Sequence, residues 1–184
     1  LIQIFTMQKP LMTVLAITFV MLNSCSSKTG SDALPVAPAS VRAVQDVVKG
    51  KKFKAEKAGT HSPFKNDKEI EWLEPKAEDK FEKEIADDSK TLQFDFMNDT
   101  SVTVVFKDKT YNGTYGVDDN TGEDEKPGIK LRVSYIDEDF KFGDGPASEV
   151  TYTYLVEGIS DKSLLLETPR SMNRRKIVVL MNKL

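Results

Sequence analysis

The sequence predicts a mainly β domain: an antiparallel up-and-down meander that closes into an eight-stranded barrel and carries two short helices. Two observations lead to this prediction. From Thr91 onward apolar residues alternate with polar ones, which is the period of a strand with one buried face. Short polar turns separate the alternating runs, so hairpin follows hairpin along the chain. A β-sandwich is the alternative, because the same alternation suits both architectures.

Eight strands are expected in the barrel. Seven of them follow the second helix, with apolar positions within residues 92–96, 102–106, 111–117, 129–135, 150–156, 164–166 and 176–181. A weaker strand at Lys51 to Ala58 precedes that helix. Closing the sheet removes the edges that so many Val and Tyr side chains would otherwise leave exposed.

The strand at residues 129–135 has the cleanest alternation. Successive side chains of a strand point to opposite faces, and a slip of one residue would bury two charges. We therefore expect the apolar residues to face the core and the polar residues to face solvent. The inward set is Ile129, Leu131, Val133 and Tyr135, and the outward set is Lys130, Arg132 and Ser134. The expected antiparallel neighbour is the strand at 150–156.

Two helices are expected before these strands. The first covers residues 41–48, where four valines recur at helical spacing, with Ser40 as its N-cap and Gly50 at its end. The second covers residues 75–88, where one face is charged and the other is a narrow apolar stripe. That stripe, which should pack on the sheet and cover one end of the barrel, is Ala77, Phe81 and Ile85.

The first 24 residues are expected to be an export signal. Lys9 precedes an apolar run over residues 10–22, which is too short for a membrane span of about 20 residues. The run ends in Leu22-Asn23-Ser24-Cys25, which resembles the lipobox of bacterial lipoproteins. The resemblance implies cleavage before Cys25 and lipid attachment to it, and two or more acyl chains anchor a protein firmly. The alternative is a plain secretory signal with an incidental cysteine.

The chain is therefore divided into three parts. Residues 1–24 are a lipoprotein signal peptide, residues 25–39 are a flexible tether that begins at the lipidated Cys25, and residues 40–184 are the β domain. Ser, Gly, Pro and Ala dominate the tether, as in flexible linkers. We expect the protein in the cell envelope, lipid-anchored in the outer membrane, with the periplasmic and the exterior face both open.

Composition excludes several classes of function. Of the 26 basic residues only Lys9 precedes Cys25, so the remainder carries 25 basic and 29 acidic residues. A mildly acidic domain has no electrostatic reason to bind nucleic acid. A single cysteine excludes an intramolecular disulfide, and a single histidine, His61, excludes a His-rich zinc site. We interpret His61 as a loop residue before Pro63.

A family resemblance accompanies this pattern. Four stretches carry it. LQFDFMNDTSVTVVF reads as a strand, a polar turn and a strand, and YNGTYGVDD reads as a strand with a Gly-Tyr pattern. IKLRVSY reads as a charged strand, and VTYTYLVEGISDKSLLLE reads as a strand that leads into three leucines. Together they resemble the lipocalin-like domains common in lipoproteins of Bacteroidetes, over roughly residues 48–183. The resemblance implies a lipocalin-like barrel. It transfers no ligand site, because Gly50-Lys51-Lys52-Phe53 replaces the usual Gly-x-Trp opening and the helix at 75–88 looks like an insertion.

Aromatic residues of the barrel are the candidate ligand contacts. An eight-stranded barrel is just wide enough to fill itself or to hold one small ligand. The candidates are Trp72, Phe94, Phe96, Tyr152 and Tyr154. The alternative is that these rings only fill the core.

Oxygen ligands gather in the segment between the third and fourth of the seven strands. Asp118, Asn120 and Asp124 are weak candidates for calcium, but the glycine spacing of an EF-hand is not met, and a solvated hairpin loop is the alternative. No metal, cofactor or catalytic residue is otherwise predicted.

The leading hypothesis is a non-enzymatic binding or interaction module held at the membrane by its lipid anchor. One alternative is a carrier of a small apolar ligand that uses a barrel cavity, and another is a protease inhibitor or an enzyme. Its partners would be the membrane and either an apolar ligand or an envelope protein. A filled interior favours the interaction module, whereas a cavity with convergent polar groups favours ligand binding.

Overall fold

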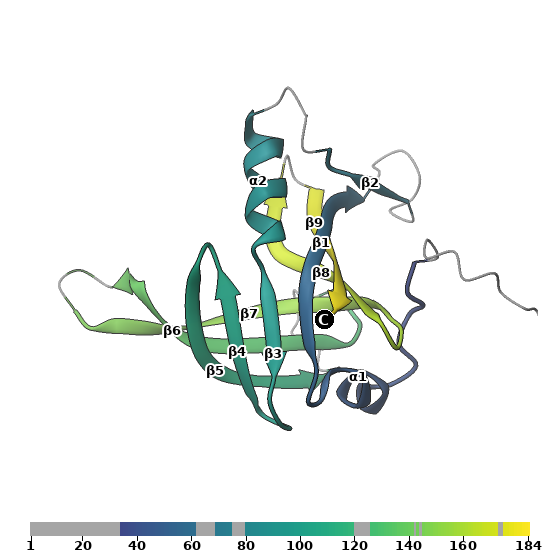
Figure 1. Ribbon diagram of the computed structural model, residues 1–184, viewed down its shortest axis with the longest axis horizontal. Coiled ribbons are helices and arrows are strands. Elements are labelled where there is room, and N and C mark those ends of the chain that lie inside the picture. Colours follow the sequence, from purple (N-terminus) through teal and green to yellow (C-terminus); the bar gives the residue numbers. More distant parts are fainter. Residues whose placement is uncertain are drawn as a thin grey trace, which may run out of the picture. The chain divides into compact units, whose positions relative to one another are not determined.

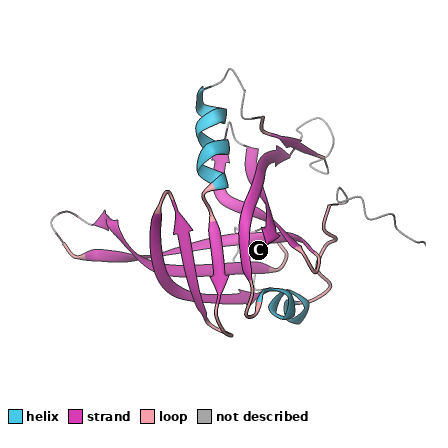
Figure 2. Cartoon of the chain, viewed as in Figure 1, coloured by secondary structure: helices cyan, strands magenta, loops and turns pink. Residues whose placement is uncertain are grey.

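The computed structural model describes residues 34–61, 69–74, 80–119, 126–141, 143, 145–172 and 175–184. The side chains of Phe81, Arg170, Ser171 and Met172 also lie outside this description. The chain is mainly β and carries two helices (Figure 2). The expected export signal, the expected lipidation site Cys25 and most of the expected tether lie outside the described residues.

The strands form a closed antiparallel barrel of eight strands, as the sequence predicted. The elements are α1 (Val41–Val48), β1 (Lys52–His61), β2 (Ile70–Trp72), α2 (Lys80–Lys90), β3 (Gln93–Phe96), β4 (Ser101–Phe106), β5 (Lys109–Asp118), β6 (Lys130–Lys141), β7 (Ala147–Ile159), β8 (Ser163–Met172) and β9 (Arg175–Lys183). Each strand from β3 to β9 pairs with its neighbour in sequence, and β1 pairs with both β3 and β9. The pairing of β1 with β9 closes the barrel, with Ala55 opposite Met181 and Thr60 opposite Ile177.

Hairpin turns fix the register of the meander. The β4–β5 turn places Lys107 and Asp108 at φ angles of 50° and 63°, the backbone that two-residue hairpins require. In the β3–β4 turn the Asn98 side-chain oxygen accepts hydrogen bonds from the backbone N–H groups of Thr100 (2.9 Å) and Ser101 (2.8 Å). These local contacts are the physical basis of the turns that the polar segments predicted.

The barrel interior is packed with apolar side chains. Each strand alternates, so one face of every strand supplies the core. The largest side chains with less than 2% exposure include Phe53, Phe94, Phe96, Leu131, Leu164, Leu166, Ile177 and Met181. In the core, Val44 and Val48 of α1 join these residues, and Ile85 of α2 packs against them. Figure 1 shows α1 and α2 on opposite sides of the barrel.

The first helix forms as expected. The Ser40 side chain accepts a hydrogen bond from the Ala43 backbone N–H at 3.2 Å, and Gly50 follows the helix at φ 65°. The second helix is described from Lys80, so Ala77 lies outside the described residues, as does the side chain of Phe81. Of the predicted stripe only Ile85 is described, and it packs against the core.

The parity of β6 is confirmed for its apolar residues and corrected at one polar position. Leu131 and Val133 are fully buried, and the strand pairs antiparallel with β7, with Val133 opposite Tyr152. Lys130, however, is only 3% exposed, so the expectation that it faces water is wrong. The outer face of this strand is covered at Lys130, and alternation within one strand cannot report what other segments cover.

Two further features were not anticipated. β2 is a short strand that pairs with the end of β1, with Trp72 opposite Gly59. The last residues of the expected tether also contact the barrel. The Ile159 N–H donates to the Val36 carbonyl oxygen at 2.8 Å, and a Cβ on Gly158 would lie 2.6 Å from the carbonyl oxygen of Pro35. The expectation of a flexible tether as far as residue 39 is therefore wrong at Pro35 and Val36, which contact the barrel.

Candidate functional site

A small pocket lies at the α2 end of the barrel. Its walls include Ile85 of α2, Leu92, Tyr135, Tyr152, Tyr154 and Thr168. Its volume is about 40 Å³. A buried water needs roughly 10–15 Å³ by this kind of measure, so the pocket has room for a few waters or the end of a small organic group.

The position of α2 beside this pocket is set by contacts between its C-terminal end and the β4–β5 turn. The Asp88 carboxylate lies 2.6 Å from Lys107 Nζ, and the Lys107 backbone N–H donates to Thr91 Oγ1 at 2.9 Å. Thr91 Oγ1 in turn donates to the Asp88 carbonyl oxygen at 2.7 Å. This network holds the helix end against the hairpin and thereby places Ile85 over the pocket.

Stacked tyrosines form the polar wall of the pocket. Tyr135 of β6 stacks on Tyr111 of β5 (ring centroids 4.5 Å apart) and on Tyr152 of β7 (5.7 Å). Burial, with smaller contributions from Tyr152 and Tyr154, raises the pKa of Tyr135 far above its ordinary value. Its hydroxyl is therefore neutral at physiological pH, and it forms a hydrogen bond with the Tyr152 side chain. The pocket thus combines apolar walls with phenol groups.

The predicted ligand contacts divide into three groups. Tyr152 and Tyr154 line the pocket. Phe94 and Phe96 are fully buried and pack on each other (5.6 Å) and on Tyr154 and Tyr115. They fill the core, which is the alternative that the sequence left open.

Trp72 is not part of the barrel interior. It lies on β2 and packs with Ile70 against a small apolar cluster on the outer face, formed by Leu165, Val178 and Leu180. Lys57 Nζ lies 4.4 Å from the centre of its ring, a cation–π contact. Trp72 therefore attaches β2 to the outside of the barrel, away from the tyrosine pocket.

The weak calcium candidates are not brought together in the described residues. Asp118 accepts a hydrogen bond from Arg132 Nε at 2.9 Å, on the outer face of β5 and β6. Asn120 and Asp124 lie outside the described residues. The Asp118 carboxylate is thus engaged by a cation of the chain itself.

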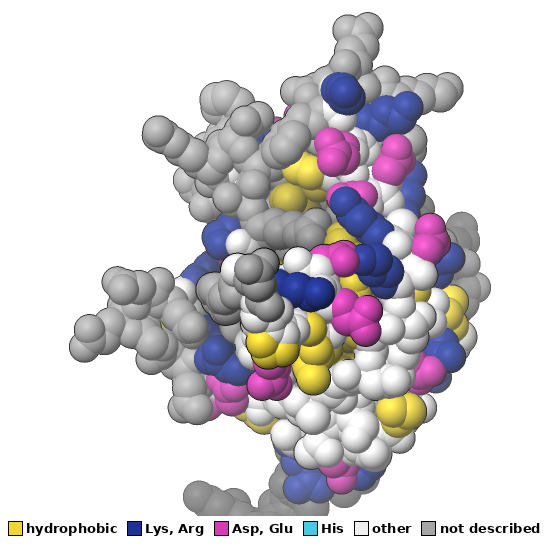
Figure 3. Space-filling model, turned by 90° about the vertical axis from the view of Figure 1, so that its left-hand side faces the viewer, with side chains coloured by type: hydrophobic (Ala, Val, Ile, Leu, Met, Phe, Trp, Pro, Cys, Tyr) yellow, Lys and Arg dark blue, Asp and Glu magenta, His cyan; other side chains and the backbone are white. Residues whose placement is uncertain are grey.

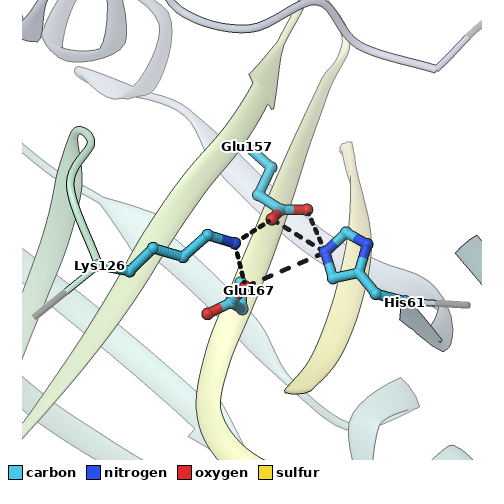
Figure 4. A network of polar contacts seen from close by, with 4 residues as sticks. All are labelled: His61, Lys126, Glu157 and Glu167. Carbon is cyan, nitrogen blue, oxygen red and sulfur yellow. Dashed lines mark hydrogen bonds and ion pairs between the residues drawn. The ribbon is translucent and has the colours of Figure 1, made fainter. Parts of the chain in front are cut away.

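A second cluster of chemically active side chains lies on the outer face of the barrel, where β1, β7 and β8 approach one another (Figure 4). His61 Nε2 lies 2.9 Å from the Glu157 carboxylate and 4.0 Å from Glu167 Oε2. Lys126 Nζ lies 2.8 Å from Glu167 Oε2 and 3.4 Å from Glu157 Oε1. The side chains of His61, Glu157 and Glu167 are exposed by only 11%, 15% and 9%.

Strand irregularities position two of these side chains. Val156 pairs with Leu166 and Gly158 pairs with Leu165, so Glu157 is the extra residue of a β-bulge in β7. Glu167 is the last residue of β8 before the regular pairing with β9 is interrupted. Bulges turn a side chain away from its regular direction and are frequent beside functional sites. The bulge therefore brings Glu157 toward Glu167 and His61.

Charge balance explains how this cluster tolerates burial. Burial opposes the charge of Lys126, but the hydrogen bond and charge of Glu167, together with Glu157, outweigh it and raise the pKa of Lys126. The ammonium group therefore stays charged between two carboxylates. Buried carboxylates are stable only with such compensation.

Sequence reasoning missed this cluster. His61 was interpreted as a loop residue before Pro63; the structure instead places it at the end of β1, bonded to a glutamate 96 residues away. The signal that could have indicated it was a pair of glutamates within otherwise apolar or uncharged strand segments, YLVEGI and LLLE.

No family model, curated protein or solved structure matches this chain. Within the described residues, neither helix is long and apolar enough to cross a membrane.

Proposed function

We propose that this protein is a lipid-anchored lipoprotein of the cell envelope, placed in the outer membrane, whose barrel is a non-enzymatic binding module. The anchor rests on the sequence, in which an apolar run over residues 10–22 leads into Leu22-Asn23-Ser24-Cys25. The binding site is the tyrosine pocket beneath α2. Its ligand is a small amphipathic molecule with an apolar end and a hydrogen-bonding group.

The pocket is the observation that carries this proposal. Apolar walls from Ile85, Leu92, Ile177 and Val179 meet the phenol groups of Tyr135, Tyr152 and Tyr154. Sites for small molecules are typically apolar with a few convergent polar groups. Because the volume is only about 40 Å³, the pocket receives the end of the ligand and the rest lies against α2.

Titration calorimetry of the full chain with 4-hexylphenol tests this proposal. Ile85→Ala enlarges the pocket and should strengthen binding, whereas Ile85→Trp and Ser89→Trp fill it and should abolish binding. Ile136→Ala is the matched control, because Ile136 is 60% exposed and lies outside the pocket. Equal affinity in the wild type and both tryptophan variants would contradict the proposal.

The second candidate is an interaction module without a small ligand. Two observations favour it: the barrel interior is packed, and Ile136 and Phe140 are exposed where β6 and β7 extend beyond the barrel (Figure 1). Figure 3 shows, on the face seen from that side, hydrophobic side chains in small separate patches among charged ones. Small patches of this kind are ordinary on a soluble surface, so the pocket carries the first proposal.

A further inference from the structure

We propose that His61, Glu157 and Glu167 form a binding site for a zinc ion on the outer face of the barrel, and that Lys126 is a counter-ion which the metal displaces. This site is separate from the tyrosine pocket. It holds the chemistry that zinc prefers, one imidazole nitrogen and two carboxylate oxygens.

The distances between the ligand atoms fit a metal with little rearrangement. At metal–ligand distances of 2.0–2.2 Å, tetrahedral geometry separates the ligand atoms by about 3.3 Å. His61 Nε2 lies 2.9 Å from a Glu157 oxygen, which is shorter than this tetrahedral separation, and 4.0 Å from Glu167 Oε2, which is longer. All three ligand atoms lie within 4.8 Å of one another, so binding of one ion requires the glutamate side chains to rotate and close the longer separations.

The cluster already holds a cation. Lys126 Nζ contacts both carboxylates, at 2.8 and 3.4 Å, so the two glutamates present their oxygens to a shared positive charge. Lys126 thus brings one positive charge to two carboxylates. The Lys126 side chain is 55% exposed, so it can move into solvent when a divalent ion neutralises both carboxylates.

The histidine is free to adopt the tautomer that a metal requires. Its Nδ1 is buried, and none of the residues that the structure describes forms a hydrogen bond with it. No donor among those residues therefore holds the Nδ1 lone pair, and the proton that Nε2 gives to Glu157 can reside on Nδ1 instead. Nε2 is then available as a metal ligand.

The ligand set favours zinc over the alkaline-earth ions. Calcium takes six to eight oxygen ligands, and magnesium requires octahedral geometry with mostly oxygen ligands. Two carboxylates and one imidazole leave a fourth, open position, which a water molecule fills in three-ligand zinc sites.

Zinc titration of the full chain, purified without a histidine tag and treated with a chelator, tests the site. We expect one zinc ion per chain, and Glu157→Gln and Glu167→Gln should each weaken binding by at least about tenfold, in line with the loss of a metal-site contact. Lys126→Gln removes the competing cation and should strengthen binding. Glu149→Gln on the same strand as Glu157 is the matched control, since Glu149 is exposed and should leave affinity unchanged.

The single histidine supplies an independent readout. The imidazole signals in NMR spectra belong to His61 alone, so zinc should shift them and place the proton on Nδ1. A Cys25→Ser variant must bind zinc as the wild type does, because Cys25 is the sole thiol. Unmoved His61 signals, equal binding in both glutamine variants, a preference for calcium, or weaker binding in Lys126→Gln would each overturn the proposal.

Discussion

Gly113 of β5 lies directly opposite Tyr135 of β6, and a Cβ at Gly113 would lie 2.9 Å from the Cβ of Tyr135 and 2.1 Å from the carbonyl oxygen of Ser134. The two strands approach each other closely at this point because residue 113 has no side chain. Beside this close approach, the ring of Tyr135 stacks on Tyr111.

This relationship predicts that Gly113→Ala destabilises the protein. The new methyl group overlaps the backbone of β6, and overpacking of this kind costs about 1–3 kcal/mol. Gly116→Ala in the same strand is the control, because a Cβ there meets nothing within 4 Å. Denaturant unfolding of both variants should show a loss for the first and no loss for the second; equal stabilities would contradict the close approach.

The apolar side of α2 predicts a second stability effect. Ile85 packs against the core, so Ile85→Ala should lower the free energy of unfolding by about 2 kcal/mol or more, as for truncation of a partly buried isoleucine. Lys83 is exposed, and Lys83→Ala should change stability by less than about 0.5 kcal/mol. Thermal unfolding measures both, and equal small effects would mean that α2 does not support the barrel.

Tyrosine ionisation predicts how stability depends on pH. Burial is the largest cause that raises the pKa of Tyr111, Tyr115 and Tyr135 above the ordinary value of 10.0. The folded state therefore favours the neutral phenols. Their contribution to stability is fully present below pH 10 and is lost as the pH rises above it, because the unfolded chain ionises first.

Phenolate absorbance during an alkaline titration tests this effect. We expect Tyr111, Tyr115 and Tyr135 to ionise above pH 10, together with loss of the β-sheet signal in circular dichroism. Ionisation of these three tyrosines near pH 10 in a chain that remains folded would contradict their burial.

The sequence near Cys25 predicts lipid attachment, and Cys25 itself lies outside the described residues. Cys25→Ala should accumulate as an uncleaved or soluble species, because neither the acyl chains nor the processing step has its acceptor. Mass spectrometry of membrane fractions from a bacterial host measures this. A mature-size, acylated Cys25→Ala protein in the membrane fraction would remove the basis for the anchor.

Structural features that depend on neighbouring residues in the chain could be predicted from the sequence. Features that depend on contacts between distant segments could not. The inward residues of β6, such as Leu131 and Val133, were predictable because alternation is a property of one strand. The position of the β4–β5 turn was predictable, because a short polar segment separates two alternating runs there. The burial of Lys130 did not follow, because it depends on what covers the outer face.

The two candidate sites could be predicted only in part for the same reason, because distant segments of the chain complete them. Tyr152 and Tyr154 were identified as aromatic residues with inward parity, yet Ile85 and Thr168, which complete the pocket, come from other parts of the chain. His61 and Glu157 are 96 residues apart, and a bulge in β7 sets their contact. Nothing in the spacing of the sequence reports such a contact, because it arises only when the barrel closes.

The location of a bound ligand is the most direct test of the account, because the central claim is that the α2 end of the barrel binds a small amphipathic molecule. NMR of the chain saturated with 4-hexylphenol measures contacts between ligand protons and assigned side chains. We predict contacts from the hexyl chain to Ile85 and Leu92 and from the phenol ring to Tyr152, with the outward-facing Lys83 unaffected. Contacts confined to Ile136 and Phe140, or no contacts at a concentration that saturates the Ile85→Ala variant, would contradict the account.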